Sequence, residues 1–177
     1  MKIAIFCAFD TPATIEFAKA TVAYLEKKGH ELTVDQRLMD HWLEKVKDFE
    51  AFDANATLSK DCKYLFSIGG DGTLLRSIPF VKDTEIPILG INTGRLGFLT
   101  SLQKESLNEA LDKFFDEKFS LVKRSLLEVE LSPTSAEEIK FGYALNEISI
   151  NRKNTTAMLS IATQIDRAYL TTYWADG

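Results

Sequence analysis

A glycine-rich stretch directly after an apolar strand limits what this chain can fold into more than any other feature. The stretch runs Ser67-Ile68-Gly69-Gly70-Asp71-Gly72-Thr73-Leu74-Leu75-Arg76, and it follows the apolar run Tyr64-Leu65-Phe66. Glycines let a backbone turn tightly and approach a ligand closely, because no Cβ stands in the way. Successive N–H groups in such a turn, together with a helix expected to start at Leu74-Leu75, form a site that suits a phosphate.

Asp71 is unexpected in such a turn, because a carboxylate repels the anion that the backbone N–H groups attract. Two functions fit its position: taking a proton from a hydroxyl group, or holding Mg²⁺. The alternative is a solvated turn residue, although a turn between a buried strand and a helix start favours a phosphate site. The two histidines, His30 and His41, are expected in a turn and on a polar helix. A carboxylate is therefore the expected general base.

The order of the expected elements places this turn in a parallel α/β fold. Strands are expected at residues 2–7, at residues 31–35 and at Tyr64. One helix is expected to begin at Thr11-Pro12 and to end at Gly29, and a second, more polar helix is expected to contain Leu38, Trp42 and Val46. Strands that alternate with helices indicate a parallel sheet, which binds ligands at the carboxyl ends of its strands. The glycine-rich turn lies at one such end.

A second glycine-containing turn, Asn92-Thr93-Gly94-Arg95, follows an expected strand at residues 85–91. Two prolines, Pro79 and Pro87, are expected to separate this strand from the helix before it. Two turns at neighbouring strand ends wall one crevice, and we expect Asn92 and Arg95 to face it. Apolar residues of the next segment are expected in the core: Leu96, Phe98 and Leu99.

The period of the apolar pattern changes after residue 118, beyond an amphipathic helix expected at residues 103–117. Consecutive strands without helices are expected at residues 121–131, 139–150, 157–166 and 168–174, with a hairpin loop at 132–138. This order predicts an antiparallel second domain, a sandwich or part of one. The alternation flips at Asn146-Glu147, which predicts a bulge or a bend that presents an amide and a carboxylate together. A bulge with both side chains in solvent is the alternative.

Composition narrows the class of protein. The 177 residues are 45% hydrophobic, enough to bury a core in one or two small domains. A net charge of −5 argues against nucleic acid or an anionic membrane as a partner, and no apolar run approaches the roughly 18 residues of a membrane span. Cys7 and Cys62 lack metal-ligand spacing and are expected to be reduced core thiols. Because Met1-Lys2 runs straight into a strand, no signal peptide is expected, and the cytoplasm is the predicted location.

Four motifs, in order along residues 69–177, resemble those of the NAD kinases. They are Gly69-Gly70-Asp71-Gly72-Thr73, Asn92-Thr93-Gly94-Arg95-Leu96-Gly97-Phe98-Leu99, Asn146-Glu147 and Ala175-Asp176-Gly177. The first is shared with the diacylglycerol and sphingosine lipid kinases, and the phosphofructokinases carry it with serine in place of threonine. The second is the more discriminating motif, and it resembles the NAD kinase pattern.

The resemblance implies an α/β fold, with an N-terminal Rossmann-like parallel sheet and helices over residues 1–120, followed by part of an antiparallel β-sandwich over residues 121–177. It also implies transfer of the terminal phosphoryl group of ATP or polyphosphate to the 2′-hydroxyl of the adenosine ribose of NAD. Mg²⁺ or another divalent cation accompanies ATP in such a reaction, and no residue is assigned to a metal.

The resemblance also implies roles for individual residues. Asp71 is the proton acceptor, and Gly70, Gly72 and Thr73 line the phosphate and the ribose. Asn146 and Glu147 bind the hydroxyls of NAD, and Asp176 contacts its nicotinamide end. Three further candidates for contact with NAD or phosphate are Arg76, Asn92 and Phe98. A solvated helix face is an equal alternative for Arg76.

The chain departs from the family pattern near its last residue. The family continues past its GDG segment into a loop that binds adenine, whereas this sequence stops at Gly177, and Trp174 stands where a basic residue is common. We therefore expect a truncated form with little activity, whose uncovered strand favours a homo-oligomer. The alternatives are a lipid kinase of the diacylglycerol or sphingosine type and a non-catalytic nucleotide-binding module.

Overall fold

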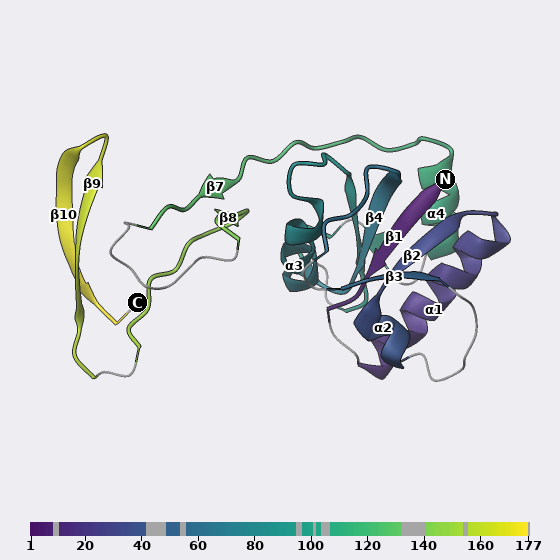
Figure 1. Ribbon diagram of the computed structural model, residues 1–177, viewed down its shortest axis with the longest axis horizontal. Coiled ribbons are helices and arrows are strands. Elements are labelled where there is room, and N and C mark those ends of the chain that lie inside the picture. The colour runs from purple at the N-terminus through teal and green to yellow at the C-terminus, as the bar shows by residue number, and fades with distance from the viewer. Residues whose placement is uncertain are drawn as a thin grey trace. The chain divides into compact units, whose positions relative to one another are not determined.

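The computed structural model divides into two compact units, Met1–Val122 and Lys123–Gly177. The residues that it describes are 1–8, 11–41, 49–53, 56–94, 97–100, 102–103, 107–131, 141–153 and 156–176, without the side chain of His41. Each unit has its own secondary structure (Figure 1).

A six-stranded sheet, with all of its pairs parallel, forms the centre of the first unit. Its strands are β1 Lys2–Phe6, β2 Glu31–Asp35, β3 Glu50–Phe52, β4 Cys62–Ile68, β5 Ile88–Asn92 and β6 Leu102–Gln103. Their order in the sheet is β3-β2-β1-β4-β5-β6. The chain extends the sheet on one side of β1 and then, from β4, on the other side. The carboxyl ends of β1 and β4 thus lie at the switch point where open α/β sheets bind ligands.

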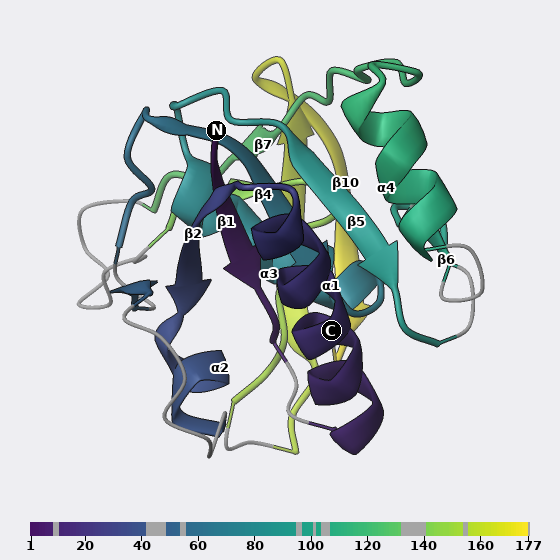
Figure 2. The same ribbon diagram turned by 90° about the vertical axis from the view of Figure 1, so that its right-hand side faces the viewer.

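Four helices accompany the sheet, and Figure 2 shows α1 lying over the strands. They are α1 Pro12–Lys27, α2 Gln36–His41, α3 Asp71–Val81 and α4 Leu107–Phe115. Phe17 of α1 and Leu111 of α4 belong to one apolar cluster, which includes Phe66 of β4. Phe80 of α3 belongs to a second cluster with Phe6 of β1. Burying these two clusters is the main source of stability for the unit.

Local signals for the first helix are confirmed by the structure. Thr11 is the N-cap of α1, its side-chain oxygen accepts the N–H of Thr14 at 3.3 Å, and Pro12 is the first helical residue. Gly29 follows the helix with φ +78°, a conformation that favours glycine, and its N–H donates to the carbonyl of Glu26 at 2.8 Å. Helix ends that depend on a few adjacent residues are predictable from those residues.

The third helix is longer at both ends than the sequence predicts. It begins at Asp71, with Gly70 as its N-cap, and not at Leu74-Leu75. Pro79 lies inside the helix, which continues to Val81. Phe80 and Val81 are buried against the sheet, and this burial outweighs the hydrogen bond that a proline cannot donate.

Other boundaries in this unit differ from prediction by a few residues. Strand β5 begins at Ile88, three residues later than expected, after Glu85 has taken a positive φ of +58°. Gln103, expected in a helix, lies in β6. Strands β3 and β6 have three and two residues, too few to produce a recognisable period. The predicted helix past Leu38 is observed as α2, and its expected members Trp42 and Val46 lie outside the described residues.

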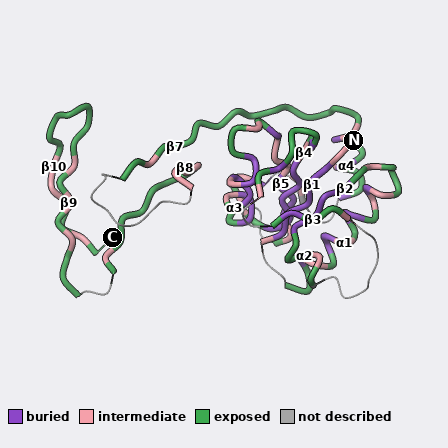
Figure 3. Tube along the Cα trace, in the orientation of Figure 1, coloured by how far each residue is buried: buried purple, intermediate pink, exposed green. Residues whose placement is uncertain are grey.

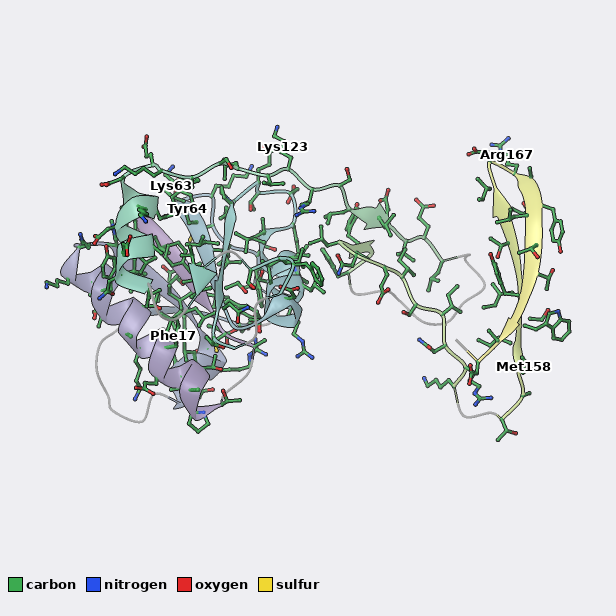
Figure 4. The ribbon with its side chains drawn as sticks, turned by 180° about the vertical axis from the view of Figure 1, so that it is seen from behind. Phe17, Lys63, Tyr64, Lys123, Met158 and Arg167 are labelled. Atoms are coloured by element: carbon green, nitrogen blue, oxygen red, sulfur yellow. The ribbon has the colours of Figure 1, made fainter. Side chains whose placement is uncertain are left out.

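The second unit contains two separate pairs of antiparallel strands. They are β7 Leu127–Glu128 with β8 Tyr143–Ala144, and β9 Leu159–Ile165 with β10 Ala168–Ala175. The two-residue turn of the longer hairpin has positive φ at both Asp166 and Arg167, which matches the right-handed twist of the strands. Figure 4 shows Arg167 at the tip of this hairpin.

The longer hairpin agrees with the predicted strands at 157–166 and 168–174, whereas the two earlier strands were predicted too long. Strand β7 takes two residues of the predicted 121–131, and β8 takes two of the predicted 139–150. Pairing ends at Ala144, and a bend follows at Leu145 and Asn146. Of the two predicted forms at Asn146-Glu147, a bulge or a bend, the structure has the bend, because no strand continues past Ala144 to carry a bulge. The predicted loop at 132–138 lies outside the described residues.

The two units differ sharply in burial (Figure 3). All of the described residues that are buried belong to the first unit, whereas the described residues of the second are exposed or intermediate. Cys7 and Cys62 are buried in the first unit and are not joined in a disulfide, in agreement with the predicted core thiols. Within the described part of the chain, no helix has the length and apolar character needed to cross a membrane.

Candidate active site

The turn between β4 and α3 is built on two glycines with different tasks. Gly69 has φ +150°, and a Cβ there would overlap the side chain of Thr73. Its N–H donates to the carbonyl of Ile91 at 2.9 Å, which ties the turn to β5. Gly70 is extended, with φ −97° and ψ −168°, and its carbonyl accepts the N–H of Thr73 at 2.9 Å. Helix α3 therefore begins immediately after these two glycines.

The start of α3 leaves backbone donors for a ligand. Within the described residues, no hydrogen bond uses the N–H of Gly70, Asp71 or Gly72. Nothing lies within 4 Å of the position a Cβ would take at Gly70 or at Gly72, and both glycines are exposed. N–H groups at the positive end of an eleven-residue helix favour an anion.

Two buried hydroxyl groups adjoin this turn. Ser67 is the last residue but one of β4, and Thr73 lies in the first turn of α3. Among the described residues, Ser67 Oγ and Thr73 Oγ1 are the buried side-chain atoms without a hydrogen-bond partner. A buried hydroxyl without a partner is uncommon. Both hydroxyls thus mark the turn as a place where polar groups remain to be satisfied.

The Asp71 carboxylate holds the segment after β5. Its Oδ2 accepts the N–H of Phe98 at 2.7 Å. Its Oδ1 accepts the N–H of Leu99 at 3.0 Å and that of Thr100 at 3.2 Å, and the Thr100 hydroxyl donates to Oδ1 at 3.4 Å. The two turns lie at the ends of neighbouring strands, β4 and β5, and this carboxylate joins the start of α3 to the segment that follows the second turn.

Gly97 makes this arrangement possible. A Cβ at residue 97 would overlap the carboxyl group of Asp71. By contrast, nothing lies within 4 Å of the Cβ position at Gly94, in the same segment. The requirement for glycine at position 97 comes from the close approach of the carboxylate.

The pKa of Asp71 reflects two opposing effects. Partial burial alone raises the pKa of this carboxyl group, but the hydrogen bonds from Phe98, Leu99 and Thr100 outweigh it, and the pKa lies below its ordinary value. These partners are uncharged N–H and O–H groups. Asp71 is therefore ionised at neutral pH, and its charge faces donors that stabilise it.

Asn92 and Phe98 lie differently from prediction. Asn92 was expected to face the crevice, but it is 2% exposed, and its Nδ2 donates to Thr100 Oγ1 at 3.0 Å. Phe98 was expected to pack in the core, but it is 98% exposed. The N–H groups of residues 98–100 turn inward to Asp71, and the Phe98 side chain is left outside. Arg95, the other residue expected at the crevice, and Leu96 lie outside the described residues.

Arg76 lies on the exposed face of α3, one turn beyond the glycines. The candidate residues of the second unit are exposed as well. Asn146 and Glu147 follow β8. The Asp176 carboxylate lies 3.5 Å from the Arg152 guanidinium, and its carbonyl accepts the Arg152 N–H at 3.2 Å.

Sequence reasoning missed three residues that these contacts depend on: Gly97, Thr100 and Arg152. Gly97 lies within the second motif, where a glycine between two apolar residues could have indicated a close contact with the backbone. Thr100 and Arg152 carry no local signal, because their partners are 29 and 24 residues away along the chain.

The described residues contain no group of three or more His, Cys, Asp or Glu side chains that could hold a metal ion. Asp71 is the carboxylate at the turn, and four hydrogen bonds already occupy it.

The sheet order, the glycine-rich turn and the open helix start define a Rossmann-like α/β protein of the nucleotide-binding class. The ATP-NAD kinase N-terminal domain family matches residues 3–119, more than half of the chain. The chain therefore belongs to the NAD kinase family, as the motifs predict.

Curated relatives and a solved structure agree with this membership. The chain is 39% identical to the NAD kinase of Christiangramia forsetii and 35% identical to that of Flavobacterium johnsoniae, in each case over 100% of this chain and 61% of the relative. A crystal structure of yeast NADH kinase complexed with NADH matches with a TM-score of 0.79 at 20% identity, over 99% of this chain and 55% of that one. The chain thus spans about 61% of the length of these curated relatives. The solved structure confirms the fold class, a Rossmann-like parallel sheet with helices followed by antiparallel strand pairs.

Proposed function

We propose that this chain carries the phosphoryl-transfer site of an NAD kinase, which phosphorylates the 2′-hydroxyl of the adenosine ribose of NAD. The donor is ATP or polyphosphate. Family membership supports the reaction, and one observation supports its location: an ionised carboxylate, Asp71, stands beside unused N–H groups at the start of α3. The names of the curated relatives favour this reading over a lipid kinase.

In this proposal the glycine-rich turn binds the transferred phosphate. The N–H groups of Gly70 and Gly72 donate to phosphate oxygens, and the first turn of α3, including Thr73, adds its positive end. The ribose hydroxyl oxygen attacks phosphorus, the bond to the leaving phosphate breaks, and the hydroxyl proton passes to Asp71. The exposed Arg76 is one turn further along α3 and adds positive charge near the phosphates.

Asp71 could contribute by removing the proton of the attacking hydroxyl or by orienting that hydroxyl, and the lowered pKa of Asp71 favours orientation as the larger contribution. A carboxylate with a lowered pKa is a weak base, so early proton removal contributes little. Phosphoryl transfer passes through a loose transition state in which alignment and charge neutralisation dominate. We infer that Asp71 mainly orients the attacking hydroxyl and takes its proton late in the reaction.

The remaining candidates are assigned to the dinucleotide. Asn146 and Glu147 bind hydroxyls of NAD, and Asp176 contacts its nicotinamide end, which requires that it leave Arg152. Phe98 offers an exposed aromatic face beside Asp71, suited to stacking on a base. Asn92 acts indirectly, through Thr100. Mg²⁺ arrives with ATP, and no step depends on a metal bound by the described residues.

We further propose that the protein works in the cytoplasm as a homo-oligomer. Two observations support self-association: the apolar side chains on β9 and β10 are exposed, and the described residues of this unit form no buried core. Light scattering after size-exclusion chromatography tests this, and a monomer at every concentration would contradict it.

The test of the proposed reaction incubates the purified chain with NAD, Mg²⁺ and either ATP or polyphosphate, and measures NADP. We expect slow NADP formation that Asp71→Asn reduces by about 10²–10⁴-fold, because asparagine cannot accept the proton. The matched control is Asp116→Asn, an exposed carboxylate that pairs with Lys118 after α4.

Three other outcomes overturn parts of the proposal. Phosphorylation of diacylglycerol or sphingosine in vesicles, with no NADP, would indicate a lipid kinase. ATP binding in calorimetry without any transfer would indicate a nucleotide-binding module. NADP formation by Asp71→Asn within a few-fold of the parent chain would remove Asp71 as the proton acceptor.

A further inference from the structure

Asn92, Thr100 and Asp71 form a chain of hydrogen bonds behind the site. The Gly94 N–H donates to Asn92 Oδ1 at 2.7 Å, Asn92 Nδ2 donates to Thr100 Oγ1 at 3.0 Å, and the Thr100 hydroxyl donates to Asp71 Oδ1 at 3.4 Å. Asn92 and Thr100 are buried, at 2% and 6% exposure. The chain thus runs from a backbone amide, through the interior, to the reacting carboxylate.

The direction of each hydrogen bond in this chain follows from the first one. Because a backbone N–H faces one end of the Asn92 amide, that end must be the oxygen, and the NH₂ end faces Thr100. The Thr100 oxygen then accepts from Asn92, so its single proton is free to point at Asp71. A threonine hydroxyl in this position donates to the carboxylate and does not compete with it for protons.

The two oxygens of Asp71 are consequently not equivalent. Oδ1 accepts three hydrogen bonds, from the N–H groups of Leu99 and Thr100 and from the Thr100 hydroxyl. Oδ2 accepts one described hydrogen bond, from the exposed Phe98 N–H. An oxygen of a carboxylate offers about two lone-pair directions, so Oδ1 is fully used and Oδ2 has one left.

We propose that Asn92 and Thr100 are positioning residues that hold Asp71 Oδ1, so that Oδ2 is the atom that receives the proton of the attacking hydroxyl. This inference rests on the proposed function and deepens it. Asn92 and Thr100 do not touch the substrate. They fix the rotation of the carboxylate, and a rotated carboxylate presents its remaining lone pair in the wrong direction.

The test removes the Thr100 hydroxyl and keeps its shape. Thr100→Val deletes the donor to Oδ1, Thr100→Ala deletes it without any steric risk, and Thr100→Ser restores it. Thr21→Val is the matched control, because Thr21 is a fully buried threonine in α1, where its hydroxyl donates to the Phe17 carbonyl at 2.9 Å. Circular dichroism identifies which variants are folded.

The first measurement needs no kinase activity. A ¹³C NMR titration of the Asp71 side-chain carboxyl group reports its pKa in each folded variant. We expect a higher pKa in Thr100→Val and Thr100→Ala, because one group that stabilises the charged form is gone, and a pKa like that of the parent in Thr100→Ser and Thr21→Val. An unchanged pKa in both hydroxyl-deleting variants would overturn the positioning role, whatever the activity.

The second measurement is NADP formation by the same variants. We expect kcat to fall about 10-fold or more in Thr100→Val, KM for NAD to stay within about twofold, and Thr100→Ser to recover most of kcat. A shifted pKa with no NADP from any protein, parent included, would contradict the proposed reaction and leave the positioning role intact. A shifted pKa with unchanged kcat would show that orientation of Asp71 does not limit transfer, which overturns the proposal.

Discussion

The two units carry similar apolar side chains and bury them to opposite extents. Phe66 in β4 is 0% exposed, whereas Trp174 in β10 is 68% exposed. Strand β4 is covered on both faces, by α1 and α4 on one and by α3 on the other, whereas the β9–β10 hairpin pairs with no third strand among the described residues. An alternating pattern supplies apolar residues, but a core requires a second layer to cover them.

Paired substitutions of aromatic residues are expected to give the largest difference between the units. Phe66→Ala should lower the free energy of unfolding by about 3–5 kcal/mol, because it leaves a cavity in a closely packed cluster. Trp174→Ala should change it by less than about 0.5 kcal/mol, since an exposed side chain loses little contact. Urea unfolding followed by circular dichroism measures both. A cost above about 2 kcal/mol for Trp174→Ala would show that the second unit has a core of its own.

Within the first unit, Gly97 and Gly94 allow a comparison between a glycine whose Cβ position is occupied and one whose Cβ position is open. Gly97→Ala should destabilise the fold by about 1–3 kcal/mol, because the new Cβ overlaps the Asp71 carboxyl group and breaks its hydrogen bonds. Gly94→Ala should be nearly neutral, since its Cβ position is open. Thermal unfolding of both variants measures the difference, and equal melting temperatures would mean that the 97–100 segment moves aside at no cost.

The smallest expected effect is a dependence of stability on pH that belongs to the first unit. The pKa of Asp71 is lower in the folded chain than in the unfolded one, so its contribution to stability is complete above about pH 4 and is lost as pH falls through the folded pKa. Asp71→Asn should remove this part of the acid slope. Urea midpoints between pH 2.5 and pH 6 measure it, and parallel curves for the two proteins would contradict the assignment.

Much of the first unit follows from neighbouring residues. The start of α1 depends on Thr11 and Pro12, and the end of α1 depends on Gly29, so a few adjacent residues were enough. The start of α3 was missed because the glycines that form its N-terminus also signal a turn. The alternation of strands and helices then predicted the parallel sheet. Strands β3 and β6 were not predicted, because they are too short to show a recognisable alternation of apolar and polar residues.

The candidate site was predictable by residue but not by orientation. Asp71 and its glycines were identified from their positions between a strand and a helix. The exposure of Phe98 was not, because it follows from hydrogen bonds between Asp71 and a segment 27–29 residues away. The burial of Asn92 was not either, because its partner Thr100 is held in place by the same hydrogen bonds to Asp71. In the second unit, the sequence indicated where apolar residues alternate and could not reveal that pairing ends at Ala144.

The hydrogen bonds between Asp71 and residues 98–100 also have a consequence for the order of folding. They close a loop that contains all of β5, and we expect them to form after this strand has paired with β4. Contacts made after the folding transition state slow unfolding and leave the folding rate unchanged. We therefore expect the Asp71 hydrogen bonds to slow unfolding of the β5 region without changing the rate of folding.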